Sequence, residues 1–144
     1  MIPPVYNRLF AAARAQGCLL FTVTVSSDDG TQVARAFSSH PKEYPVLGTK
    51  PIDRDAWYDH VMIGLNSFIA NTPAAFEQLF FDHALITAMG LGSALNIPLV
   101  AEGRVLGTLN FLAEAHHFTP TKLAAYHAMI QADHQALAKA MQGG

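Results

Sequence analysis

The chain has 144 residues, of which 51% are hydrophobic and 14% charged, and its formal net charge is −2. This length is typical of one compact domain, and we expect residues 1–144 to form a single domain. A net charge so close to zero offers no basic surface for phosphate groups, which argues against nucleic acid as a partner. No segment approaches the ~20 apolar residues that cross a bilayer, so we expect no membrane partner and a cytoplasmic location.

The first forty residues predict a helix followed by a β-hairpin. Apolar residues at helical spacing between Val5 and Ala13 indicate a short helix, which Gly17 can end in the left-handed conformation. Residues 18–26 alternate apolar and polar side chains, as a half-buried strand does. After a turn at residues 27–30, a second strand at residues 31–40 is expected to place four side chains on one face: Val33, Arg35, Phe37 and Ser39.

Residues 41–92 predict an irregular segment of short elements. Prolines and glycines interrupt its first part, which we therefore expect to be a loop. Asp53 is the expected N-cap of a helix that carries Trp57, and residues 67–71 are expected to form a short strand. Two more helices are expected to begin at Thr72 and Asp82, the first of them carrying Phe76, Leu79 and Phe80.

The last fifty residues predict two antiparallel strands and a long helix. The strands lie on either side of Gly103, whose neighbours are polar as in a hairpin turn. Thr119 followed by Pro120 is a typical helix start. From there, apolar side chains at spacings of three, four and seven predict one continuous helix as far as Met141.

This C-terminal segment resembles the second half of GAF domains in its strand, turn and helix-start motifs. The matching residues are Ser93, Ile97-Pro98-Leu99, Leu106-Gly107-Thr108-Leu109 and Phe118-Thr119. The resemblance implies an α+β fold of the GAF/PAS type, an α/β/α sandwich with a central antiparallel sheet of five to six strands. It implies that the N- and C-terminal helices pack on one sheet face and that residues 41–92 cover the other. A ligand would lie between the sheet and this cover.

Polar side chains on the predicted strands are the first candidates for lining such a site. A polar group buried on a covered sheet needs a hydrogen-bond partner, which a ligand, a trapped water or a neighbouring side chain can supply. Asn96 and Asn110 bonding each other is the main alternative, and Trp57 as a core residue or Arg35 in solvent are others. The candidate ligand-binding residues are Arg35, Phe37, Ser39, His40, Tyr44, Trp57, Tyr58, Asn71, Asp82, His83, Ser93, Asn96, Thr108 and Asn110.

The histidines and the single cysteine indicate neither a metal site nor a nucleophile. The seven histidines show no ligand-pair spacing, with His127 and His134 two helical turns apart and His116 and His117 expected in a solvated loop. An axial haem ligand stays open as an alternative, so the cofactor is undetermined. Cys18 is expected to be a buried thiol with a raised pKa.

Three established activities of the GAF family require residues that this sequence lacks. A free-methionine-sulfoxide reductase needs several cysteines, and the bilin-binding branch needs a cysteine in the middle region, whereas Cys18 lies near the start. The Asn-Lys-x-Phe pattern of the cyclic-nucleotide branch is absent. The family leaves the ligand open, because its members bind chemically unrelated small molecules.

The resulting hypothesis is a stand-alone GAF domain that binds a small molecule and signals to a separate output protein. The rival is a small soluble enzyme that uses the same pocket for acid–base chemistry on a small polar metabolite, with His40 meeting Asp82 across the cover. A third hypothesis is an interaction module without a ligand. We expect a homodimer through the terminal helices, because an alanine-rich face around Ala124 and Ala136 allows close approach, although helix propensity alone also explains those alanines.

Overall fold

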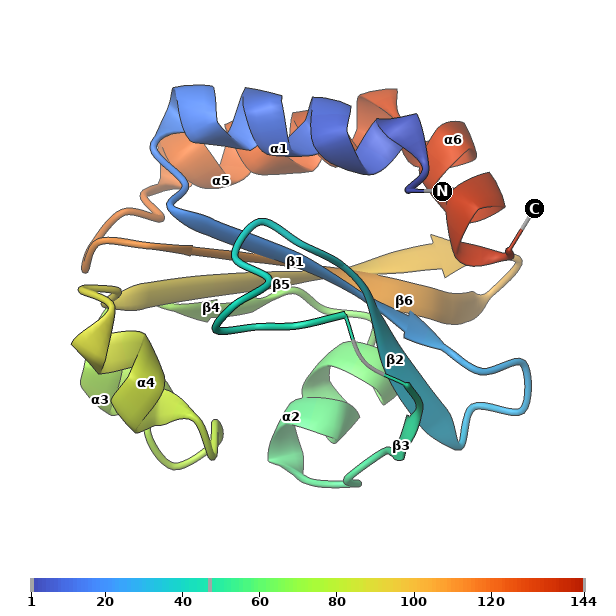
Figure 1. Ribbon diagram of the computed structural model, residues 1–144, viewed down its shortest axis with the longest axis horizontal. Coiled ribbons are helices and arrows are strands. Elements are labelled where there is room, and N and C mark those ends of the chain that lie inside the picture. The colour runs from blue at the N-terminus through green and yellow to red at the C-terminus, as the bar shows by residue number, and fades with distance from the viewer. Residues whose placement is uncertain (1, 47, 144) are drawn as a thin grey trace.

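One antiparallel sheet forms the middle layer of the structure, with helices above and below it (Figure 1). The computed structural model describes residues 2–46 and 48–143. Within these residues six strands pair in the order β3-β2-β1-β6-β5-β4. The predicted α+β architecture is therefore confirmed. The strands are β1 Leu20–Ser26, β2 Gln32–Ser38, β3 Lys50–Pro51, β4 Phe68–Ala70, β5 Ser93–Ala101 and β6 Arg104–Ala113.

Helices from both ends of the chain lie together over one face of the sheet (Figure 1). This terminal-helix layer consists of α1 Pro4–Gln16, α5 Pro120–Ala132 and α6 His134–Met141. Gly17 ends α1 with a φ of 110°, and the Thr119 hydroxyl accepts a hydrogen bond from the Lys122 amide at 3.2 Å, as both residue types predict. The apolar side of the layer packs on the inner sheet face through Tyr126, Ile130, Leu137 and Met141.

The single C-terminal helix predicted from the sequence is wrong, because the chain leaves helical geometry at Asp133. This residue has φ −106° and ψ 13°, and its carboxylate forms a 3.1 Å ion pair with Arg8 of α1. One residue later, the His134 ring lies 2.7 Å from the Val100 carbonyl at the end of β5. Contacts to two other elements therefore accompany the break, and helical spacing alone does not reveal them.

Short elements between β2 and β5 cover the opposite sheet face (Figure 1). We call residues 41–92 the cover. Its helices are α2 Ala56–Tyr58, the π-helix η1 Asp59–Ile63, α3 Pro73–Phe76 and α4 His83–Ala88.

Three capping or length predictions in the cover are wrong. Asp55, not Asp53, caps α2, because its carboxylate accepts the Tyr58 amide at 2.9 Å. The helix after Thr72 ends at Phe76, which leaves Leu79 and Phe80 in the following loop. Asp82 precedes α4 as predicted, but its side chain forms no cap hydrogen bond.

Alternate residues of β1 and β6 face the two different layers. Phe21 pairs with Phe111 and both are fully buried under the terminal helices. The next pair, Thr22 and Asn110, faces the cover. The alternation predicted for β1 is therefore confirmed and separates an apolar face from a polar one.

A β-bulge in β2 changes the face of Phe37. Val23 pairs with Phe37 whereas the next residue, Thr24, pairs with Arg35, so the register shifts by one residue at Ala36. Phe37 consequently packs in the helix-side core while Arg35 faces the cover. The prediction that these two side chains share a face is wrong, since a bulge reverses the alternation beyond it.

Candidate functional site

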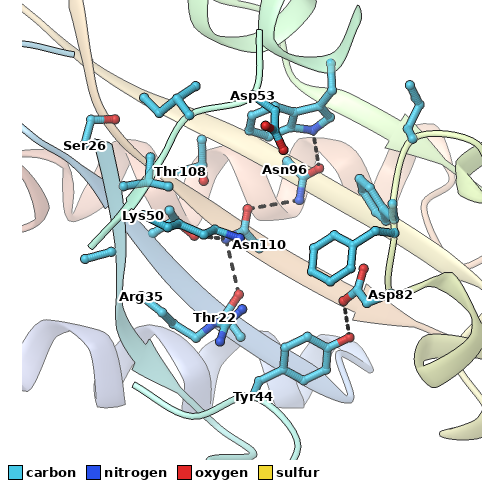
Figure 2. Close-up of a pocket in the computed structure, with 18 of the residues that line it drawn as sticks. Thr22, Ser26, Arg35, Tyr44, Lys50, Asp53, Asp82, Asn96, Thr108 and Asn110 are labelled. Carbon is cyan, nitrogen blue, oxygen red and sulfur yellow. Dashed lines mark hydrogen bonds between the residues drawn. The ribbon is translucent and has the colours of Figure 1, made fainter. Parts of the chain in front are cut away.

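A cavity of about 280 Å³ lies between the polar sheet face and the cover. This volume is close to the lower end of about 300 Å³ for pockets that hold small ligands. Its floor is formed by β1, β2, β5 and β6, and its walls come from the cover. Figure 2 shows polar side chains from these elements converging on the same space.

A continuous series of hydrogen bonds crosses the cavity floor, and we call its five residues the polar ladder (Figure 2). The Trp57 indole donates to Asn96 Oδ1 at 2.9 Å, and Asn96 Nδ2 donates to Asn110 Oδ1 at 3.0 Å. Asn110 Nδ2 then donates to the hydroxyls of Thr22 and Thr24 at 3.2 and 3.1 Å. The mutual Asn96–Asn110 bond anticipated as an alternative is therefore present.

The Trp57 indole determines which groups donate and which accept along the polar ladder. An indole N–H can only donate, so it fixes the side-chain oxygen of Asn96 as its acceptor. That choice turns the Asn96 amide group toward the Asn110 oxygen and the Asn110 amide group toward Thr22 and Thr24. The two threonine hydroxyls therefore receive hydrogen bonds from the floor and keep their own hydrogens for another acceptor.

A second polar group joins the cover to β2 through Tyr44. The Tyr44 hydroxyl donates to Asp82 Oδ2 at 2.5 Å, and the Arg35 guanidinium carbon lies 5.1 Å from the centre of the Tyr44 ring. Burial, followed by the hydrogen bond to Asp82, raises the pKa of the Tyr44 hydroxyl. Tyr44 therefore stays neutral and holds a cation on one side and a carboxylate on the other.

Seven of the fourteen candidate residues line this cavity. Arg35 and Tyr44 lie on one side of it, and Trp57 lies on the wall that α2 provides. The cover also contributes Asp82, placed before α4. The floor contributes Asn96 from β5 and Thr108 and Asn110 from β6.

The other seven candidates lie outside the cavity lining. Most of them contact other parts of the fold instead. Phe37 is in the core under α1. Ser39 accepts from the Phe21 amide and lies 2.8 Å from the His40 ring, which ties both to the end of β2. The Arg54 guanidinium carbon lies 5.5 Å from the centre of the Tyr58 ring, and His83 is the first residue of α4.

Asn71 and Ser93 fix loop connections instead of lining the cavity. The Asn71 side chain exchanges two hydrogen bonds with the Phe118 backbone, at 3.1 and 2.9 Å. The Ser93 hydroxyl donates to the Glu114 carbonyl at 2.6 Å. Both hold the cover and the start of β5 against the loop before α5.

The lining residues that the sequence did not single out fall into two groups. Leu20, Ser26 and Leu112 continue the strand faces of the polar ladder, so extending the alternation at both ends would have found them. The cover contributes side chains for which the sequence carries no comparable signal, because their positions depend on irregular loops. These include Lys50, Ile52, Asp53, Asp55, Met62, Leu79, Phe80, Phe81 and Ile86.

No histidine or cysteine belongs to the lining within residues 2–46 and 48–143. The expected contact between His40 and Asp82 is wrong. Asp82 accepts a hydrogen bond from Tyr44, and the His40 ring contacts Ser39. Burial raises the pKa of Cys18 to about 12, as expected for a sheltered thiol. The searched part of the chain also holds no group of three metal-ligating side chains.

Four further histidines contact structural partners, whereas His116 is exposed as expected. His117 was expected in solvent, but it is half-buried with its ring 2.9 Å from the Tyr126 hydroxyl, and burial lowers its pKa. His127 lies 2.9 Å from Ser67 and His134 contacts Val100, so the break at Asp133 places these two on different helices. His60 lies 2.9 Å from the Ser67 carbonyl.

Comparisons with known proteins agree with this architecture. The family model described as GAF domain matches residues 3–130, whereas no curated protein matches the chain. The GAF domain of a two-component sensor histidine kinase from Bacillus halodurans superposes with a TM-score of 0.75 at 10% identity, covering 100% of this chain and 98% of that one.

Two further solved structures extend the comparison. A GAF domain/HD domain protein from Geobacter sulfurreducens gives a TM-score of 0.76 at 14% identity, over 99% of this chain and 95% of that one. The fRMsr of Staphylococcus aureus, solved in complex with substrate, gives 0.60 at 10% identity over 84% and 72%. These identities are low, so the likeness concerns the fold. Among the described residues, no helix has the length and apolar character required to cross a membrane.

Proposed function

The chain belongs to the GAF domain family, and from that premise we propose that it is a sensory module that binds a small molecule in the cavity beneath the cover. GAF domains are generally small-molecule-binding sensory modules, and the solved structures with this fold include domains of two-component sensor histidine kinases. The observation that carries the proposal is the coexistence of a fixed polar ladder with open space. A floor that only served stability would be expected to be filled by side chains, as the opposite face is.

The cover supports a role in sensing because it contributes to both the cavity wall and the floor's hydrogen bonds. Trp57 holds one end of the polar ladder, and Asp82 holds the hydroxyl of Tyr44. A ligand in the cavity would contact these same residues, so occupancy would change the position or stability of the cover. Loops held on a rigid sheet are a common location for binding function.

Native mass spectrometry of the protein purified under mild conditions tests the proposal directly. We expect a bound small molecule, or binding of one from a metabolite library, that is lost when Thr108→Phe or Ala34→Phe fills the cavity. Ala75→Phe on the exposed surface of α3, outside the cavity lining, is the matched control and should retain binding. Unchanged binding in both filled variants would place the ligand elsewhere, and a cavity that accepts no library member would refute the proposal.

Dimerisation through the terminal-helix layer is part of the same proposal. Ala124, Ala128 and Ala132 of α5 are exposed and small enough for a second helix to approach closely. Light scattering at micromolar concentration should give the mass of a dimer, and Ala128→Glu should give that of a monomer. A monomer mass for the wild type would reject this part.

Location and output also belong to the proposal. A cytoplasmic location is consistent with the lone cysteine, since disulfide frameworks are typical of oxidising compartments. We propose a separate output protein that recognises the ligand-bound form. Its capture should depend on the same ligand that binds the wild-type cavity and should fail with Thr108→Phe.

A further inference from the structure

Three side chains that keep free hydrogen-bond donors among the described residues lie in one row across the cavity floor. Arg35 on β2 pairs with Thr24 on β1, and Thr24 pairs in turn with Thr108 on β6. Directly paired residues on neighbouring strands have their side chains about 4.5–5.5 Å apart at Cβ, so these three share one surface. We call Arg35, Thr24 and Thr108 the donor row.

The Arg35 guanidinium is half-buried and has no counterion within residues 2–46 and 48–143. Its one recorded hydrogen bond runs from Nη1 to the Pro45 carbonyl at 2.9 Å, and the Tyr44 ring covers one side of it. A guanidinium carries five N–H donors in a planar fork, so most of them remain free to bind an oxyanion. Figure 2 shows Arg35 in the cavity near Thr22 and Tyr44.

The two threonines of the donor row present hydroxyl hydrogens on the next two strands of the floor, β1 and β6. Thr24 already accepts from Asn110 and donates to no described residue, so its hydrogen needs an outside acceptor. Thr108 is 3% exposed and its hydroxyl forms no recorded hydrogen bond in the described chain. Ser26, two residues beyond Thr24 on the same face, has a fully buried hydroxyl without a partner there. A buried hydroxyl without a partner destabilises the fold, and a ligand acceptor would remove that cost.

The rest of the lining describes the body and charge of the ligand. Leu79, Phe80, Ile86 and Leu112 form an apolar section of the wall, which suits a hydrocarbon body. Two cations, Arg35 and Lys50, and three aspartates, Asp53, Asp55 and Asp82, line the cavity, so the aspartates oppose a second negative charge such as that of a phosphate ester. The wall therefore favours a single negative charge attached to an apolar group.

From these contacts we infer that the cavity binds a small organic carboxylate whose charged group lies on the donor row and whose apolar body lies against the cover. This inference rests on the proposed function, because it names the chemical class of ligand for the same cavity. The planar carboxylate matches the fork of Arg35 and can accept the Thr24 and Thr108 hydrogens at the same time. The polar ladder supports it by directing the Thr24 hydroxyl hydrogen away from Asn110.

Calorimetric titration with acid and amide pairs tests the inference. The probes are butyrate, hexanoate, octanoate and 3-phenylpropionate, each with its primary amide, and phenyl phosphate as a dianion. Acid and amide share a shape and differ in charge, so at least one acid should bind tenfold or more tightly than its amide. The amide and phenyl phosphate should bind weakly.

Variants of the donor row identify which side chain binds the carboxylate. Arg35→Gln should weaken the acid tenfold or more and remove its advantage over the amide, while Arg35→Lys should restore part of it. Thr108→Val, which keeps the shape and loses the hydroxyl, should weaken the acid three- to tenfold. Arg104→Gln removes a surface arginine bonded to Asp28 outside the cavity and should change nothing.

The outcomes separate the ligand class from the proposed function. Amides that bind as tightly as their acids, or acid binding that survives Arg35→Gln in a variant with an unchanged melting profile, would overturn the carboxylate while leaving the cavity a binding site. Failure of every acid in the series would also overturn it. Sensing itself fails only if native mass spectrometry and the metabolite library find no occupant that depends on the cavity.

Discussion

Strands β1 and β6 bury different kinds of side chain on their two faces. One face carries close-packed apolar side chains, and the other carries hydrogen-bonded polar side chains beside a cavity. Toward the terminal helices, Phe21 and Phe111 stack with ring centres 5.0 Å apart and no exposed surface. Toward the cover, their neighbours Thr22 and Asn110 form a hydrogen bond beside a cavity. One face is therefore specialised for stability, and the other keeps polar groups fixed while leaving space for a guest.

The largest predicted difference comes from the same substitution on each face of β6. Leu109 is fully buried under the helices, whereas Leu112, three residues on, lines the cavity. Leu109→Ala should lower the free energy of unfolding by about 3–5 kcal/mol, because close packing leaves a void that cannot collapse. Leu112→Ala should lower it by about 2 kcal/mol, since its side chain already borders open space. Urea denaturation checks both, and a Leu112 variant as unstable as the Leu109 variant would contradict the comparison.

A pH-dependent loss of stability is predicted on the packed side. Cys18 belongs to the helix-side core, and burial raises its thiol pKa from 9.0 to about 12. Because the folded-state pKa is higher, this contribution is complete below pH 9 and is lost as the pH rises from 9 toward 12. Between pH 8 and pH 10.5 the wild type should lose about 2 kcal/mol more than Cys18→Ala. Urea midpoints at the two pH values measure this, and parallel losses in both proteins would show that the thiol is not sheltered.

A smaller effect is predicted where the cover meets the polar face. Trp57→Phe keeps a ring on the wall but removes the indole donor to Asn96. We expect a loss of about 1 kcal/mol, the typical value of one hydrogen bond. Without this donor, the side-chain amides of Asn96 and Asn110 can flip by 180°, which turns the Asn110 oxygen toward Thr24. Thr24 can then donate its hydroxyl hydrogen to Asn110 instead of to the ligand, so acid binding should weaken. Unchanged affinity in this variant would show that the polar ladder does not orient the donor row.

The smallest stability effect is predicted for Arg35 itself. The guanidinium is half-buried, has no ion-pair partner among the described residues and forms one recorded hydrogen bond. Arg35→Gln should therefore change the free energy of unfolding by about 0.5 kcal/mol or less while weakening acid binding tenfold or more. Thermal melts of the ligand-free proteins check this, and a severe loss of stability would show that Arg35 belongs to the structure and not to the site.

The sequence predicts the faces of the regular strands well and the irregular parts poorly. Alternation in β1 separates Thr22 from Phe21 because side chains of a strand point to opposite sides at every step. The same rule fails at Phe37, since a bulge depends on how two strands pair and not on either sequence alone. The break at Asp133 escapes prediction for a similar reason, because its partner Arg8 is distant in the chain.

The candidate site was predicted most fully on the strands, whereas in the cover the sequence singled out only Tyr44, Trp57 and Asp82 among the lining residues. Asn96, Thr108 and Asn110 follow from their place in regular strands, and all three line the cavity. His40, Asn71 and Ser93 are polar and near the site in sequence, yet each is used by a local turn or loop contact. The sequence does not show which polar side chains form hydrogen bonds within the loops, so only the structure reveals that these three residues lie outside the cavity.

A crystal structure of the protein grown in the presence of the tightest-binding acid would test the central claim most directly. The account predicts density for that molecule between sheet and cover, with its carboxylate on Arg35, Thr24 and Thr108 and its body against Phe80. A cavity closed by the protein's own side chains, or one that holds only water while the acid is bound elsewhere, would contradict it.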